Sequence, residues 1–273
     1  MAAKKISNFR YADDTVICGN DHEEICNLLD AINERGKEKN MKLNAKKTKV
    51  MHIGKGPYQN VAIDGVILER VEDFIYLGSC KTSSGECKTD VERRIAQAKS
   101  KMIDLDNIWK DKDLSLSLKL KIMRVLVWTT VMYGAEGWTL RQEEKKKIQA
   151  AELWFYRILL NVTWRQRRTN ESILLEELKV KRELFGNIVR RKLSFFGHQI
   201  RSKNSRLVSD ITQGKIEGKR GRGRPKISYM DNMKQWTGMS MSDAIRACYD
   251  REGWRKIVMK AARAANALED DAG

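Results

Sequence analysis

Short alternating runs of hydrophobic residues occupy the first third of the chain. Residues 6–10 and 15–18 form two extended runs on either side of an acidic pair, which is a β-hairpin pattern. The run VAIDGVILE alternates about Asp64 and Gly65, a dipeptide that is typical of two-residue hairpin turns. Further short strands are predicted at residues 50–53 and 74–77.

Helical spacing of apolar residues dominates elsewhere. A helix is predicted from the N-cap Asp21 to Gly36, because the apolar residues between them recur at intervals of three and four. The same spacing from Val91 to Trp109 predicts an amphipathic helix. Further helical segments are predicted over residues 114–133, 148–159, 173–178 and 184–200, and from Ser240 with Asp243 three residues on.

These patterns predict an α+β fold, with short antiparallel strands and a helix first and helices afterwards. The two prolines, Pro57 and Pro225, each lie within two residues of a glycine and mark the clearest interruptions of regular structure. The predicted parts are a strand-containing region at 1–87, a helical bundle at 88–165, a basic helical region at 166–212, a Gly- and Arg-rich linker at 213–226, and a C-terminal helical segment at 227–273.

Positive charge is abundant and unevenly distributed. The 273 residues carry a formal charge of +17. Residues 1–160 contribute +5 and residues 161–273 contribute +12; this surplus is complete by Lys226, and the last 47 residues balance to zero. Such a distribution indicates a polyanionic partner such as nucleic acid.

The compartment is predicted to be intracellular. The first ten residues lack the apolar core of a secretory signal, and no apolar run approaches the roughly 18 residues of a membrane span. Five cysteines without a CxxC pair argue against a disulfide framework and for a reducing environment. We therefore expect a nuclear or cytoplasmic protein that does not enter a membrane.

Asp13 and Asp14 are the most informative residues for chemistry. They occupy the tip of the first predicted hairpin, between apolar runs. Adjacent carboxylates in such a place suit a divalent cation, and phosphoryl-transfer enzymes use carboxylates of this kind to hold two Mg²⁺ ions. The alternative is an exposed turn, because Asp is a common turn residue.

Longer motifs resemble a known family. FRYADDTVI at residues 9–17 resembles the catalytic hairpin of reverse transcriptases, KLNAKKTKVM at 42–51 is similar to the next palm motif, and FIYLGS at 74–79 is similar to the primer-grip hairpin. Four downstream motifs resemble non-LTR (LINE-type) retrotransposon polyproteins, most closely the RTE or Bov-B-like group: VMYGAEGW at 131–138, FFGHQIR at 195–201, GRGRPKISYMDN at 221–232 and DREGWRKIV at 250–258.

The resemblance implies an RNA-directed DNA polymerase, a nucleotidyltransferase that uses Mg²⁺ with an RNA template and a DNA primer. Asp13 and Asp14 would be its catalytic metal ligands, residues 1–87 part of the palm, and residues 88–165 a thumb-like region. The family palm also has an aspartate on an earlier strand, with the fingers upstream. Neither is found in this sequence, so we expect a truncated, C-terminal portion that has no polymerase activity alone.

Four more residues acquire roles through the resemblance. Lys47 would contact the incoming triphosphate or donate a proton to the leaving pyrophosphate; the alternative is a solvated lysine among other lysines. Tyr76, Leu77 and Gly78 would position the primer end. For the side chains of Tyr76 and Leu77 we favour burial in the core, as we do for the tryptophans on apolar helix faces.

The Gly- and Arg-rich linker is the second candidate site. Its run Gly221–Lys226 matches the core of an AT-hook, in which arginines enter a narrow minor groove. A nuclear localisation patch or a solvated linker are the alternatives. As a competing function, the chain could be a non-catalytic nucleic-acid-binding remnant acting through residues 161–226, or a fragment that does not fold stably. The candidate contacts are Lys219, Arg220, Arg222, Arg224 and Lys226.

Overall fold

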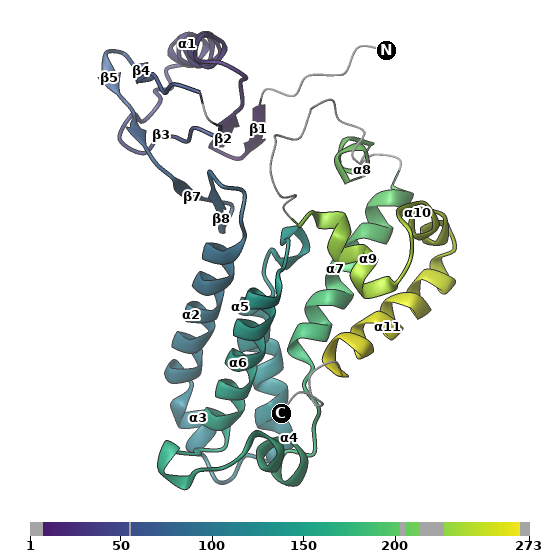
Figure 1. The fold of residues 1–273 in the computed structure, drawn as a ribbon. Coiled ribbons are helices and arrows are strands. Elements are labelled where there is room, and N and C mark those ends of the chain that lie inside the picture. Colours follow the sequence, from purple (N-terminus) through teal and green to yellow (C-terminus); the bar gives the residue numbers. More distant parts are fainter. Residues whose placement is uncertain (1–7, 55, 203–205, 213–226, 268–273) are drawn as a thin grey trace. The chain divides into compact units, whose positions relative to one another are not determined.

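The structure is a computed structural model and describes residues 8–54, 56–202, 206–212 and 227–267. The chain divides into two compact units, residues 1–86 and residues 87–273. The first unit contains all the described strands and one helix, and the second is helical (Figure 1). The predicted α+β fold class is therefore confirmed.

The strands of the first unit pair two by two. All three predicted hairpins are present, whereas the strand predicted at 50–53 was largely wrong, since the observed two-residue strand shares only Val50 with that range. The antiparallel pairs are β1 (Asn8–Tyr11) with β2 (Asp14–Ile17), β4 (Ala62–Ile63) with β5 (Val66–Ile67), and β7 (Asp73–Tyr76) with β8 (Ser79–Thr82); β3 (Lys49–Val50) pairs in parallel with β6 (Glu69–Arg70).

Positive φ angles explain two of the tight turns. Asp64 and Gly65 have φ values of 47° and 79°, and Leu77 and Gly78 have values of 47° and 77°. Two successive residues with positive φ are the signature of the type I′ turn, whose twist matches that of the flanking strands. The Asp-Gly signal in the sequence therefore located the β4–β5 turn correctly.

Helix α1 (His22–Glu38) organises the small core of the first unit. It begins where predicted, because the Asp21 side chain accepts a hydrogen bond from the Glu24 amide at 2.8 Å. At its other end, the Asp64 carboxylate accepts hydrogen bonds from Asn33 at 3.0 Å and from Lys37 at 2.6 Å. The fully buried apolar side chains of this core are Leu29, Val61, Ile63 and Leu68.

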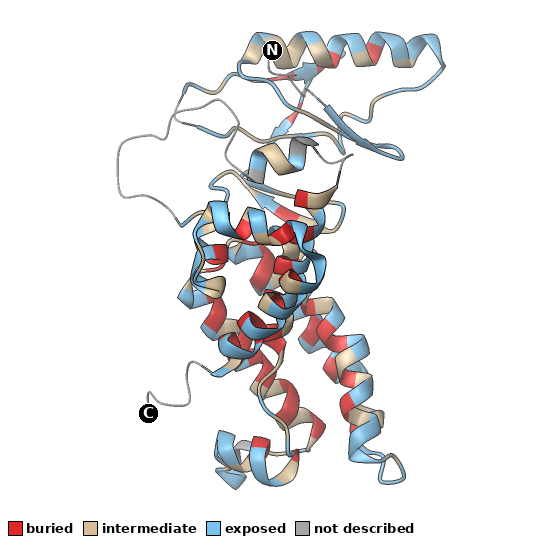
Figure 2. Cartoon of the chain, turned by 90° about the vertical axis from the view of Figure 1, so that its right-hand side faces the viewer, coloured by how far each residue is buried: buried red, intermediate tan, exposed pale blue. Residues whose placement is uncertain are grey.

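The second unit consists of helices around one larger core, and Figure 2 shows its buried residues on the inward-facing sides of the helices. Its α-helices are α2 (Lys88–Asp104), α3 (Asp106–Lys110), α4 (Leu116–Ile122), α5 (Thr129–Val131), α6 (Gln142–Leu159), α7 (Leu184–Arg201), α8 (Arg206–Thr212), α9 (Tyr229–Thr237), α10 (Met241–Tyr249) and α11 (Arg251–Ala267). Two π-helical segments, η1 (Met123–Trp128) and η4 (Ser172–Glu177), and two 3₁₀ turns, η2 (Ala135–Gly137) and η3 (Trp164–Gln166), lie between them.

Most predicted helices are confirmed, with several differences. The helix predicted from Val91 to Trp109 is divided at Leu105 into α2 and α3, and the segment predicted from Ser240 is divided into α10 and α11. The apolar stretch 114–133 is not one helix: α4 continues into the π-helical η1 and then α5. Apolar spacing does not distinguish these forms, since a π-turn shifts the register by a single residue. Helix α9 was not predicted separately, although Ser228 and Asp231 form a capping box at its start.

Buried tryptophans anchor this core. Trp109 and Trp128, which fall in predicted helices, are buried as expected for tryptophans on apolar faces, and Trp138 is buried as well. Trp109 Nε1 donates to the Met102 carbonyl at 2.7 Å and Trp254 Nε1 donates to the Leu193 carbonyl at 3.0 Å. Each of these bonds satisfies an indole donor that would otherwise be costly to bury. In the described part of the chain, no helix has the length and apolar character needed to cross a bilayer.

Candidate catalytic hairpin

The β1–β2 hairpin carries the acidic pair at its tip. Tyr11 pairs with Asp14, so Ala12 and Asp13 form a two-residue turn. Ala12 has φ 50°, whereas Asp13 is not among the residues with positive φ. Positive φ at the first central position alone is the pattern of a type II′ turn, in which glycine is the usual residue. A positive φ is unfavourable for alanine because of its β-carbon, at a cost of about 1 kcal/mol, so the tip is held in a strained form.

Both carboxylates are exposed to solvent. Within the described chain, neither Asp13 nor Asp14 forms an ion pair or a side-chain hydrogen bond. The described residues also contain no cluster of three or more His, Cys, Asp or Glu side chains suited to a metal. Mg²⁺ is commonly held by one or two carboxylates together with substrate phosphates and water, so the pair has the donor chemistry that Mg²⁺ requires.

The hairpin is anchored through its second strand. Ile17 of β2 packs against the small core together with Ile25 of α1. Gly19 follows, and a β-carbon there would lie 2.9 Å from Ile25 Cγ1, so the chain passes close to the helix. On β1, by contrast, Phe9 and Tyr11 are 45% and 65% exposed. The acidic tip therefore projects from a strand that is fixed on one side only.

Lys47 lies in a turn that its own neighbours hold in place. The Asn44 side chain accepts a hydrogen bond from the Lys47 amide at 3.2 Å, and Thr48 Oγ1 donates to the Asn44 carbonyl at 2.9 Å. The Lys47 side chain is exposed, and the described contacts join it neither to Asp13 nor to Asp14. The sequence motif thus becomes a structured turn that presents a lysine to solvent.

The β7–β8 hairpin carries the three residues assigned to the primer end. Tyr76 is half-buried at the end of β7, while Leu77 and Gly78 form the turn. Leu77 is 40% exposed, so the expectation that its side chain is buried in the core was wrong. The reason is geometric: the first residue of a type I′ turn points beyond the end of the ladder. The five basic residues predicted in the linker, Lys219, Arg220, Arg222, Arg224 and Lys226, lie outside the described residues.

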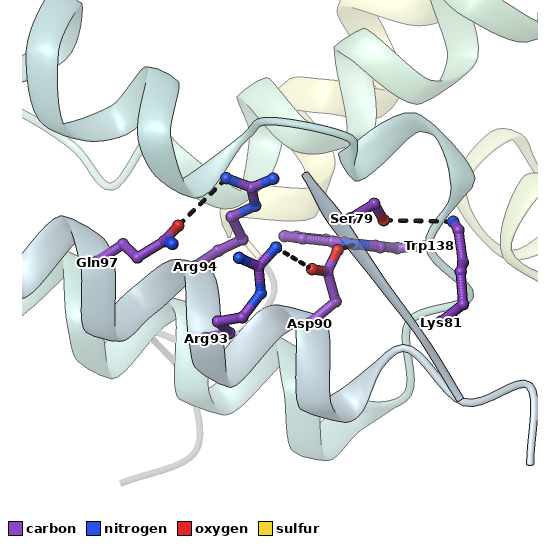
Figure 3. Close-up of polar contacts among 7 residues, drawn as sticks. All are labelled: Ser79, Lys81, Asp90, Arg93, Arg94, Gln97 and Trp138. Carbon is purple, nitrogen blue, oxygen red and sulfur yellow. Dashed lines mark hydrogen bonds and ion pairs between the residues drawn. The ribbon is translucent and has the colours of Figure 1, made fainter. Parts of the chain in front are cut away.

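Buried polar groups in the second unit were missed by sequence reasoning. Asp90 is only 1% exposed and accepts hydrogen bonds from Trp138 Nε1 at 2.9 Å and from Arg93 at 3.0 Å (Figure 3). The arginine and the indole donor compensate the cost of burying the Asp90 carboxylate. Its bond to Trp138 also connects α2 to the segment that precedes α6.

Lys192 of α7 is fully buried. Its Nζ donates to the Asn232 side-chain oxygen at 3.1 Å and to the Trp138 carbonyl, and lies 4.2 Å from the ring centroid of Tyr229. Burial lowers the pKa of Lys192 to about 7. A signal was present in the sequence, since Lys192 falls four residues after Ile188 on the apolar face of its helix.

Glu152 of α6 occupies a similar position at the start of α7. Its carboxylate accepts hydrogen bonds from the amides of Glu183 and Leu184 at 2.8 and 3.0 Å, and from the Tyr156 hydroxyl at 3.2 Å. Burial raises the pKa of Glu152. Glu152 thus caps the start of α7 although it lies thirty-one residues before Glu183 in the sequence, so no local sequence pattern indicates this role.

Comparison with known proteins supports the resemblance of the hairpin motifs. Residues 2–81 match the reverse transcriptase (RNA-dependent DNA polymerase) family. An uncharacterised transposon-derived protein of Caenorhabditis elegans is 22% identical over 240 residues, covering 85% of this chain and 85% of the relative. No solved structure matches the chain. The first unit is therefore similar to reverse transcriptases, and most of the chain is similar to a transposon-derived protein.

Proposed function

We propose that this chain serves RNA-directed DNA synthesis as the C-terminal portion of a non-LTR (LINE-type, RTE or Bov-B-like) retrotransposon reverse transcriptase. The observation that supports it most is the pair of exposed, unpaired carboxylates of Asp13 and Asp14 at the tip of a hairpin, within the segment that matches the reverse transcriptase family. A nucleic-acid partner also agrees with the net charge of +17.

In this proposal Asp13 and Asp14 hold Mg²⁺. Bound Mg²⁺ would supply charge neutralisation at the reacting phosphate and activation of the attacking oxygen, as in other two-metal sites. The chain's own residues bind and orient the substrates. Lys47 presents a positive charge to the triphosphate, and the exposed Leu77 with Tyr76 and Gly78 supports the primer end.

The proposal includes the expectation that the isolated chain binds metal without extending a primer. The family resemblance implies a further palm aspartate, and no residue of this sequence matches it. Asp64, the other aspartate in a hairpin turn, is engaged by Asn33 and Lys37, and its pKa is lowered by the hydrogen bond from Lys37. It therefore has a structural role in the first unit.

Metal binding at the tip can be tested directly with Mn²⁺ as a paramagnetic substitute for Mg²⁺. Mn²⁺ should broaden the NMR signals of the β1–β2 hairpin, and Asp13→Asn or Asp14→Asn should weaken this broadening. Asp64→Asn is the matched control, because it removes an aspartate from another hairpin turn of the same unit. Equal broadening in all three variants would refute the assignment of the metal ligands.

Polymerase activity is tested by primer extension on an RNA template with Mg²⁺ and dNTPs. We expect no extension by the isolated chain. Extension that depends on Mg²⁺ and is abolished by Asp13→Ala would confirm the reaction and overturn the expected inactivity. Salt-dependent nucleic-acid binding without any metal binding at the hairpin would select a non-catalytic binding role instead.

A further inference from the structure

The C-terminal segment carries no net charge by count, and its described part gathers several basic residues on one helix face. Residues 227–273 contain seven basic and seven acidic residues. Three of the acids lie at helix starts: Asp231 belongs to the capping box of α9, Asp243 accepts from Ser240 Oγ before α10, and Asp250 accepts from the amides of Glu252 and Gly253 at the start of α11. Acids in these places compensate helix N-termini. Of the other acids, Glu252 lies on the same face of α11 as several basic residues, and residues 269–271 lie outside the described part of the chain.

Four of those basic residues share one exposed face of α11. They occur at intervals of one, three and four residues and line a shallow hollow of about 570 Å³ together with Glu252 and Met259. Within the described chain, none of the four forms an ion pair or a side-chain hydrogen bond. We call this face the α11 basic stripe: Arg255, Lys256, Lys260 and Arg263.

The opposite face of α11 fixes the direction of the stripe. Helix α11 lies along α7 (Figure 1), and two glycines of α7 allow the close approach. A β-carbon at Gly186 would lie 2.3 Å from Asn266 Nδ2, and one at Gly197 would lie 2.3 Å from Trp254 Nε1. The stripe therefore lies on a helix that packs closely against the core, so the backbone of this helix need not become ordered when a partner binds.

We propose that the α11 basic stripe binds the phosphate backbone of a nucleic-acid duplex. The class of partner rests on the proposed function, whereas the surface lies outside the residues that match the reverse transcriptase family. From Arg255 to Arg263 the helix rises about 12 Å, a length over which duplex DNA presents about seven negative charges. The residues that line the hollow include no aromatic ring on which single-stranded bases could stack.

The test compares two variants of the full chain that lose the same number of charges. The stripe variant replaces all four stripe residues by Ala. The control variant carries Lys101→Ala, Lys121→Ala, Lys146→Ala and Lys234→Ala, which removes four exposed charges from four different helices. Circular dichroism and thermal melting establish that both variants are folded, which is expected because alanine is a strong helix former.

Binding to a labelled duplex is measured by fluorescence anisotropy at several salt concentrations, with EDTA present. If four phosphate contacts are lost, the log-log salt slope of the stripe variant should fall by about 3 to 4 and its affinity by at least about tenfold near 100 mM salt. The duplex affinity of the control variant should fall by less than about threefold. Equal losses in the two folded variants would mean that net charge alone matters and would overturn the proposal.

Further binding measurements identify the nucleic acid and separate this inference from the proposed function. Duplex DNA, an RNA–DNA hybrid and duplex RNA all present the recognised phosphates, so a stripe-dependent preference among them identifies the source. Equal stripe-dependent binding of a single strand would overturn the duplex assignment. If the metal experiment fails while the stripe result holds, only the proposed function is refuted.

Discussion

Because Lys192 is buried, the stability of the second unit should increase with pH above neutrality. The lysine is enclosed by the Trp138 carbonyl, Asn232 and the rings of Tyr229 and Trp236, and its side chain has no exposed surface. These groups favour the ammonium form. Burial opposes them and lowers the pKa from 10.5 to about 7. The informative perturbation is Lys192→Met, which keeps the stem of the side chain and removes the charge.

The sign and size of the effect follow from proton linkage. Because the pKa of Lys192 is lower in the folded state, the unfolded chain holds more protons between pH 7 and 10, and stability rises with pH over that window. Below pH 7 the folded chain bears the full free-energy cost of keeping the buried lysine protonated, about 5 kcal/mol. Between pH 7.0 and 8.5 the folded chain should gain about 1.6 kcal/mol. The pKa of Cys87 is raised to about 11 by burial, and its opposing contribution begins near the ordinary thiol value of 9.0.

The assay is guanidinium unfolding followed by tryptophan fluorescence at pH 7.0 and 8.5. The unmodified chain should gain about 1 to 2 kcal/mol at the higher pH, and Lys192→Met should gain little. Comparing the two chains cancels the titration of other groups. A difference between their pH responses below about 0.5 kcal/mol would show that Lys192 stays protonated and would refute the reasoning.

Two further outcomes concern the same core. Gly197→Ala should destabilise the second unit by about 1 to 3 kcal/mol in thermal melts, because the added methyl overlaps Trp254 Nε1; Gly137→Ala, where a β-carbon meets nothing within 4 Å, is the control and should change little. Because burial raises the pKa of Glu152, the unmodified chain should lose stability as pH rises from 5 to 7. Glu152→Gln removes this titration, so the variant should become more stable relative to the unmodified chain over the same range. Parallel pH responses of the two chains would contradict this.

Local sequence signals were sufficient for the hairpins and for the helix ends. Asp64-Gly65 marks its turn because few residues accept two successive positive φ angles. Asp21 marks the start of α1 because a short side-chain acceptor satisfies an amide of the first turn. Both signals act over a few residues, so they hold wherever the segment lies in the fold.

Local signals were insufficient where a partner lies far along the chain. Glu152 caps α7 from α6, and Asn232 bridges α9 to both backbone groups of Leu140 at 2.8 Å. The exposure of Leu77 depended on turn geometry, which overrode its hydrophobic character. The candidate site divides in the same way: the acidic tip was predicted, whereas its strained Ala12 and the absence of intramolecular partners among the described residues required the structure.

By itself, the sequence determined the α+β fold class, the acidic hairpin and its resemblance to reverse transcriptases, because these depend on short-range periodicity and on contiguous motifs. Only the tertiary structure decided where the charges and the buried polar groups lie. A count over residues 227–273 sums to zero, yet three acids lie at helix starts away from the α11 basic stripe, whose four bases share their hollow with Glu252 as the one acid among its lining residues. Electrostatic interaction depends on distance in space and on burial, and neither quantity can be read from a linear sum.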